Sequence, residues 1–190
     1  MSLHIIGGRF KNRSLKTPKK ASVRPTLAIV RKAVFDICQA QIEGAQVLDL
    51  FAGSGAMGLE ALSRGASHAT FVELDRDSYR CIEENIQTLN VSDAATLHFG
   101  NALSLLKKFR EKKNKFDLIY IDPPYQEEKL LSDVLHLIDE VDLLSEGGIV
   151  FVEEASPPHL MTEKLALQHL TYKDTRKFGK SVLHQFLRLL

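Results

Sequence analysis

Short apolar runs alternate with amphipathic stretches along most of this chain. The apolar runs have the length of buried strands and lie at residues 47–50, 69–74, 95–99, 116–121 and 148–153. Between them, apolar residues recur at helical spacing in 57–64, 77–89, 102–109 and 127–140. An earlier helix is expected to begin at Thr26, whose hydroxyl can cap it, with Leu27, Val30, Val34 and Ile37 on its apolar face.

Repeated strand–helix units predict an α/β fold with a mostly parallel sheet that is covered on both faces. The segment from Leu165 to Leu189 predicts two further strands around a turn at Gly179. At the other end, residues 3–6 and 9–15 predict a short strand pair around a glycine turn. We therefore expect a hairpin arm over residues 1–25 and a Rossmann-like domain over residues 26–190.

Composition narrows the class of protein. With 190 residues and 44% hydrophobic content, the chain can form one substantial core. It has no signal peptide and no apolar run near the roughly 20 residues of a membrane span, so we expect a cytoplasmic protein. Cys38 and Cys81 lie on separate helical stretches without a CxxC pattern, which predicts buried thiols and no metal site.

Charge is distributed unevenly along the chain. Residues 1–35 contain nine of the 25 basic residues and none of the 24 acids, which leaves the remainder net acidic. A polyanion such as nucleic acid would therefore meet the arm. We expect phosphate contacts from Arg9, Lys11, Arg13 and Arg24, and a hairpin close to the substrate edge of the sheet. The alternative is a solvated extension without a partner.

A glycine loop follows the strand at 47–50. Gly53, Gly55 and Gly58 match the dinucleotide fingerprint, with Glu73 twenty residues after the first glycine, so an NAD or FAD site remains open. Asp49 favours a different ligand, because a carboxylate repels a pyrophosphate and attracts an ammonium group. S-adenosylmethionine carries an ammonium and a sulfonium but no phosphate.

The strand at 116–121 ends in Asp122-Pro123-Pro124-Tyr125. A base amine becomes a better nucleophile when its two N–H groups donate hydrogen bonds, and the Asp122 side chain and the Pro123 carbonyl can accept them. The two prolines hold that carbonyl in place, and Tyr125 offers a ring for a flipped base. A proline-rich turn without function is the alternative. Because the motif suits any exocyclic amine, guanine N2, adenine N6 and cytosine N4 all remain open.

Four polar sites follow strands and should therefore share the carboxyl edge of the sheet: the glycine loop, Glu73, Asn101 and Asp122. Glu153 and Glu154, at the end of the last apolar run, could approach this edge, but a solvated strand end is the favoured interpretation. Tyr120 is expected in the core.

Several motifs together resemble the bacterial 16S rRNA guanine-N2 methyltransferase family. They are Ile5-Ile6-Gly7-Gly8, Arg24-Pro25-Thr26, Leu48 to Gly55, Gly58 to Ala66, Val72-Glu73 and Asp122 to Tyr125. The similarity runs from about residue 3 to Gly179. It implies a seven-stranded methyltransferase sheet with an antiparallel last strand, S-adenosylmethionine as methyl donor, and a guanine of small-subunit rRNA as acceptor.

The resemblance also assigns residues by position. Asp49, Gly53 and Gly55 would hold the methionine part of the cofactor, Glu73 the ribose and Asn101 the adenine edge. Phe51 and Ala102 complete the expected cofactor site, and Asp122 to Tyr125 would hold the base. The implied partner is 16S rRNA, within a small-subunit assembly particle, and the implied state is a monomer. Lys32 and Asn12 depart from the family pattern on the presumed RNA side.

Two other classes of function remain possible. The glycine fingerprint alone would suit a dinucleotide-dependent oxidoreductase. An RNA-binding assembly factor with a degenerate nucleotide fold would share the basic arm, but it would not need an intact Asp-Pro-Pro-Tyr.

Overall fold

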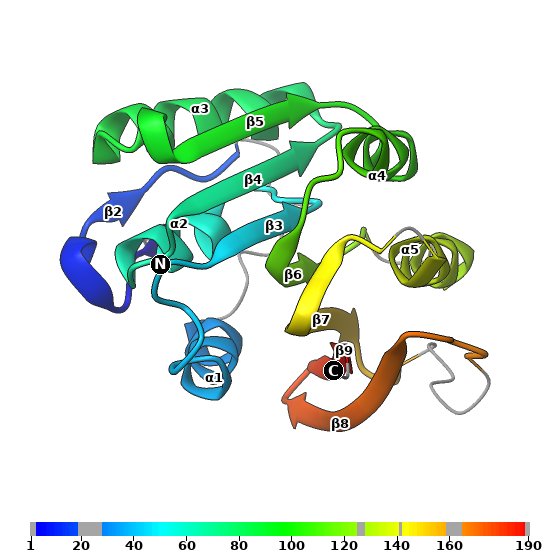
Figure 1. Ribbon diagram of the computed structural model, residues 1–190. Coiled ribbons are helices and arrows are strands. Elements are labelled where there is room, and N and C mark those ends of the chain that lie inside the picture. Colours follow the sequence, from blue (N-terminus) through cyan, green and yellow to red (C-terminus); the bar gives the residue numbers. More distant parts are fainter. Residues whose placement is uncertain (1–2, 19–27, 125–127, 141, 159–164, 189–190) are drawn as a thin grey trace.

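The computed structural model describes residues 3–18, 28–124, 128–140, 142–158 and 165–188 (Figure 1). The elements in chain order are β1 (Leu3–His4), η1 (Gly8–Phe10), β2 (Ser14–Leu15), α1 (Ala28–Ile37), β3 (Gln46–Leu50), α2 (Ala56–Ser63), β4 (His68–Glu73), α3 (Arg76–Leu89), η2 (Ser92–Ala94), β5 (Ala95–Phe99), α4 (Ala102–Glu111), β6 (Phe116–Ile121), α5 (Glu128–Glu140), β7 (Leu144–Ala155), β8 (Leu170–Phe178) and β9 (Ser181–Arg188). Among these residues, no helix is long and apolar enough to cross a membrane.

The main sheet has seven strands in the order β5-β4-β3-β6-β7-β9-β8. β3 to β7 pair in parallel, and β9 runs antiparallel to both of its neighbours. The predicted α/β sheet of seven strands with an antiparallel last strand is therefore confirmed.

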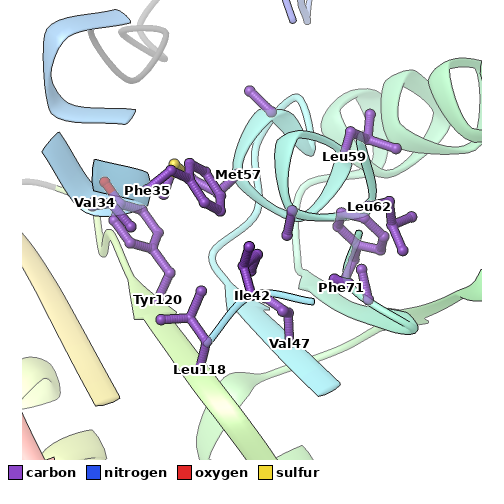
Figure 2. Packing of buried hydrophobic residues seen from close by; sticks show 14 of the residues in the cluster. Val34, Phe35, Ile42, Val47, Met57, Leu59, Leu62, Phe71, Leu118 and Tyr120 are labelled. Carbon is purple, nitrogen blue, oxygen red and sulfur yellow. The ribbon is translucent and has the colours of Figure 1, made fainter. Parts of the chain in front are cut away.

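Helices cover both faces of the sheet, which explains why its central strands are apolar without alternation. α1, α2 and α3 pack on the face that carries Val47, Phe71 and Tyr120 (Figure 2). α4 and α5 pack on the face that carries Leu48 and Ile119. Successive strand residues point to opposite faces, so each central strand contributes to both cores.

Side-chain caps fix two of the helices that follow strands. Asp75 accepts a hydrogen bond from the Ser78 amide at the start of α3, at 2.8 Å. Asn101 accepts one from the Ser104 amide at the start of α4, at 3.2 Å. The expected cap Thr26 lies outside the described residues.

Both cysteines are buried, as predicted. The Cys81 thiol donates a hydrogen bond to the Lys16 carbonyl at 3.1 Å. Burial raises the pKa of each thiol to about 11. Neither thiol is therefore activated as a nucleophile at neutral pH.

The N-terminal strand pair is present and packs into the main core. β1 and β2 pair antiparallel, but the connection contains η1 and is longer than the glycine turn that the sequence predicts. Leu3, Ile5 and Leu15 are buried together with residues of α1 and α2. The expected boundary between residues 25 and 26 falls in a segment outside the described residues.

The hairpin lies at the amino edge of the sheet, opposite to where the sequence places it (Figure 1). α2 starts after the carboxyl end of β3 and ends at Ser63, just before the amino end of β4. The Ser63 hydroxyl accepts from the Phe10 amide (2.9 Å) and donates to the Gly7 carbonyl (2.6 Å). The expectation of a hairpin beside Asp122 is therefore wrong, because its apolar residues and polar partners on α2, not its charge, decide where it docks.

Gly58 allows α2 to approach β4. A Cβ on Gly58 would lie 2.3 Å from the ring of the buried Phe71. We expect Gly58→Ala to lower the free energy of unfolding by about 1–3 kcal/mol, which denaturant titration can measure. The cost should shrink in a Phe71→Leu background, where the ring edge is absent. An equal cost in both backgrounds would contradict this packing argument.

Candidate active site

Polar side chains from five adjacent strands meet at the carboxyl edge of the sheet. Glu73 ends β4, Asn101 follows β5, the glycine loop follows β3 and Asp122 follows β6. These four strands are neighbours in the order β5-β4-β3-β6, so the predicted convergence is confirmed. β7, the next strand, contributes Glu153.

The glycine loop turns sharply from β3 into α2. Phe51, Gly53 and Gly55 all have left-handed backbones, with φ of 59°, 58° and 75°. For Phe51 this conformation costs about 1 kcal/mol or more, a strain that is typical of ligand-binding turns. The turn places the start of α2 at the carboxyl edge of the sheet, where the amides of its first turn have no partner within the helix.

Asp49 lies beneath this loop. Its side chain is 2% exposed, and Oδ2 accepts a hydrogen bond from the Gly58 amide at 3.0 Å. Burial raises the pKa of Asp49, the Gly58 amide opposes this shift and the charge of Glu73 adds to it, and the resulting pKa is about 8. A cation bound nearby would remove this electrostatic cost, so the position suits an ammonium group better than a phosphate.

Glu73 ties the loop to the end of β4. Oε2 accepts from the Gly53 amide at 2.7 Å, and Oε1 accepts from the Leu74 and Asp75 amides at 2.7 and 2.8 Å. These bonds fill three of the roughly four acceptor positions of a carboxylate. Capacity for one ligand hydroxyl remains, on Oε2.

An apolar surface lies beside Glu73 and Asn101. Leu74 and Phe99, at the ends of β4 and β5, are 59% and 47% exposed. Tyr79 packs edge-on against Phe99 with 5.6 Å between ring centroids. Sequence reasoning missed Leu74 and Phe99, although a large apolar residue ending a strand at the ligand edge was an available signal. Exposed rings at this place suit the face of a purine.

Asn101 and Ala102 begin α4 at the same corner of the site. Asn101 is exposed, and its Oδ1 is used by the Ser104 amide. Ala102 is buried at the first position of the helix, where backbone N–H groups have no partner within the helix. A heterocycle resting on Phe99 could receive hydrogen bonds from this helix start.

The Asp-Pro-Pro segment forms the other side of the site. Asp122 and Pro123 are half-buried, and Pro124 is exposed. Tyr125 lies outside the described residues. Burial and the nearby charges of Glu153 and Asp49 raise the pKa of Asp122 well above its usual value.

Glu153 is part of this site, and the expectation of a solvated strand end is wrong. Its side chain is 5% exposed, and its Oε2 accepts a hydrogen bond from the Tyr120 hydroxyl. Tyr120 is buried in the core, as predicted, with only its hydroxyl engaged in polar contact. The sequence cannot reveal this burial because β7 is flanked by β9, a strand from the far end of the chain.

Glu154 is buried on the opposite face of the sheet, so the solvated interpretation fails there too. Its Oε1 lies 2.9 Å from His184 Nε2, and His184 Nδ1 lies 2.6 Å from Thr175 Oγ1. Neighbouring carboxylates of one strand therefore serve two separate networks.

The candidate RNA-contacting residues lie away from this edge. Arg9, Lys11 and Arg13 are exposed on the hairpin, and an Arg13 guanidinium N–H donates to the Thr88 carbonyl at 3.2 Å. Arg24 lies outside the described residues. The structure therefore does not gather these residues with the glycine loop and Asp122.

Known proteins share both the sequence and this architecture. The family described as "Conserved hypothetical protein 95" matches residues 3–187. The chain is 35% identical over 173 residues to the putative rRNA methyltransferase YlbH of Bacillus subtilis, covering 90% of this chain and 94% of that protein. It is 36% identical over 151 residues to ribosomal RNA small subunit methyltransferase D of Escherichia coli, covering 80% and 74%.

A solved structure agrees over the whole length. The putative methyltransferase yhhF from Escherichia coli superposes with a TM-score of 0.83 at 29% identity, covering 100% of this chain and 99% of that one. The motifs at one sheet edge and these matches lead to the same conclusion: the chain belongs to the "Conserved hypothetical protein 95" family, and it is similar to proteins named as a putative rRNA methyltransferase and as a ribosomal RNA small subunit methyltransferase.

Proposed function

We propose that the protein transfers a methyl group from S-adenosylmethionine to the exocyclic N2 of a guanine in 16S rRNA. The observation that carries this proposal is the placement of the glycine loop and Asp122 at the ends of the adjacent parallel strands β3 and β6. A cofactor held by the loop would present its reactive end toward a base amine held by Asp122.

The residues present fit this cofactor. When bound, S-adenosylmethionine supplies an electrophilic methyl group on a cationic sulfur. The Asp49 carboxylate and the amides that begin α2 would hold the methionine part, Glu73 would accept a ribose hydroxyl, and Phe99 with the start of α4 would hold the adenine.

A dinucleotide fits the same residues less well. The Gly53 amide already donates to Glu73, and buried Asp49 lies under the loop where a pyrophosphate would rest. Two acidic side chains at this place disfavour the negative charge of a pyrophosphate and favour a cation. Calorimetry with NAD and with S-adenosylmethionine distinguishes the oxidoreductase alternative.

Asp122 and Pro123 would act on the base amine. The lone pair of the amine nitrogen is delocalised into the ring. Hydrogen bonds accepted from both of its N–H groups favour the pyramidal geometry that the nitrogen needs for attack. Asp122 would accept one hydrogen bond through its side chain and Pro123 the other through its carbonyl. We further propose that Tyr125 stacks on the flipped base.

The position of the hairpin suggests a large substrate. A single RNA that contacts both the basic hairpin and Asp122 must extend from the amino edge to the carboxyl edge of the sheet (Figure 1). A folded RNA or a small-subunit assembly particle meets this requirement better than a short strand. We propose that a monomer acts on the particle, in the cytoplasm.

Removing charge from the hairpin should weaken RNA binding. Replacing Arg9, Lys11 and Arg13 by alanine should lower the magnitude of the slope of log K against log salt by at most about 0.9 per lost phosphate contact. Affinity for S-adenosylmethionine should stay unchanged.

The control removes equal charge from α4, by replacing the exposed residues Lys107, Lys108 and Arg110. Equal losses in both triple variants would mean that net charge, not the hairpin, carries RNA affinity. Wild-type affinity in the hairpin variant would leave the arm without a role in RNA binding.

The direct test of the reaction is methyl transfer from labelled S-adenosylmethionine to 16S rRNA or to small-subunit particles, followed by nucleoside identification. Labelled N2-methylguanosine supports the proposal. Labelled N6-methyladenosine would move it to the adenine alternative, and RNA binding without any transfer would favour the assembly factor.

A further inference from the structure

Asp49, Tyr120, Asp122 and Glu153 project from one face of the sheet. Asp49 on β3 is paired in register with Tyr120 on β6, and Tyr120 is paired in register with Phe151 on β7. Side chains two residues apart share a face, so Asp122 and Glu153 emerge beside Tyr120. Asp122 and Glu153 occupy equivalent positions on the two strands, because each directly follows one of the paired residues Ile121 and Val152.

Burial raises the pKa of Glu153, and hydrogen bonds from two hydroxyl groups oppose that shift. The Tyr120 hydroxyl donates to Oε2 of Glu153, and the Ser181 hydroxyl on β9 donates to the same carboxylate. Hydrogen bonds to a carboxylate favour its charged state. Burial and then the nearby carboxyl groups of Glu153 and Asp49 raise the pKa of Asp122, and no hydroxyl group of the described residues donates to it to oppose this shift.

Other elements contribute the remaining charged groups near this cluster. Arg31 of α1 is buried and interacts electrostatically with Tyr120 and Glu60. Glu73 at the end of β4 adds a negative charge near Asp49. The free site thus gathers several carboxyl groups, and a proton that relieves their repulsion should reside on Asp122, to which no hydroxyl group in the described part of the chain donates.

We propose that Glu153 is a positioning residue that keeps a proton on Asp122 in the free protein, so that Asp122 becomes an acceptor for the base amine only after a cationic methyl donor has entered. This inference rests on the function proposed above. A protonated Asp122 presents an O–H donor on one oxygen, which competes with acceptance from an amine. Entry of a sulfonium would lower the cost of ionising Asp122, and its proton would leave to solvent.

The ionised Asp122 can then take the proton that the reaction releases. The bond from nitrogen to the methyl carbon forms as the carbon–sulfur bond breaks, with that electron pair remaining on sulfur. The nitrogen, now cationic, loses one proton to the Asp122 carboxylate. The product amine is neutral, and the pair of carboxyl groups returns to its singly protonated state, as expected for two close carboxyl groups that titrate together.

Carbon-13 NMR of protein labelled at the aspartate side-chain carboxyl tests the proton directly, without turnover. The Asp122 resonance is identified by its loss in Asp122→Asn. In the free wild-type protein Asp122 should titrate far above an ordinary aspartate, and in Glu153→Gln its pKa should fall by about one unit or more. The matched control is Glu154→Gln, the neighbouring carboxylate on the opposite face, which should leave the Asp122 titration unchanged.

If Glu153→Gln fails to fold, the Asp122 titration can be measured in Tyr120→Phe instead. Losing one donor raises the pKa of Glu153, so the shared proton moves toward Glu153 and Asp122 titrates lower. An Asp122 titration that is the same in wild type and in the folded variants would overturn the inference.

The pH profile of kcat/KM then separates this inference from the proposed function. The acid limb of methyl transfer should move to lower pH in Glu153→Gln. A variant with reduced activity at every pH and an unmoved limb would show a structural role and overturn the inference. A wild-type protein that transfers no methyl group would instead refute the proposed function, while the NMR titration would still report on the pair.

Discussion

Asp122→Ala is expected to reduce kcat by about a hundredfold or more, the usual effect of removing a group that acts on a proton in the transition state. The hydrogen bond from the base amine strengthens as nitrogen becomes pyramidal and acquires charge, so its loss raises the barrier more than it weakens binding. Cofactor affinity should stay nearly intact, because Asp122 follows β6 whereas the cofactor loop follows β3.

Single-turnover methyl transfer measures this effect, with calorimetry of S-adenosylmethionine as the control. Asp122→Asn should be intermediate, because the amide keeps one acceptor and loses the charge. An unchanged kcat in Asp122→Ala would remove the residue from the mechanism. Loss of cofactor binding in the same variant would show that the substitution disturbs the loop.

Binding of S-adenosylmethionine should release a proton from Asp49. Its pKa of about 8 means that the free protein holds a proton there at pH 7, whereas a bound cation favours the carboxylate. The contribution of Asp49 to affinity should therefore increase as pH rises toward 8, by up to about tenfold per unit, and fade above pH 8, and any proton released from Asp122 adds to this dependence. Calorimetry at pH 7 in two buffers of different ionisation enthalpy counts the released protons.

Asp49→Asn is the control for this linkage. The asparagine oxygen can still accept from the Gly58 amide, so the loop should keep its shape, while one titrating group is gone. The variant should bind more weakly above pH 8, with roughly one proton fewer released at pH 7. Equal proton release in wild type and variant would mean that Asp49 does not respond to the ligand's charge.

Much of the fold follows from local patterns in the sequence. Strands buried on both faces must be continuously apolar, and helices between them must run back across the sheet, so the order of elements and the edge that binds ligands are determined by the alternation itself. Asp122 and Glu73 could be assigned to that edge because each directly follows an apolar strand.

Other features depend on contacts between distant segments. From the sequence alone Glu153 is expected to be solvated, and only the pairing of β9 with β7 buries it. The hairpin is positioned by Ser63 and buried Glu60, which accept hydrogen bonds from the amides of Phe10 and Ile6. Its basic residues predict a partner but carry no information about position. Phe99 was overlooked because an apolar residue at a strand end is equally typical of the core.

The most direct test of the central claim is mass spectrometry of 16S rRNA nucleosides from cells that lack this chain. The account predicts the loss of one N2-methylguanosine, restored by the wild-type protein and not by Asp122→Ala. An unchanged N2-methylguanosine content, or restoration by Asp122→Ala, would contradict it.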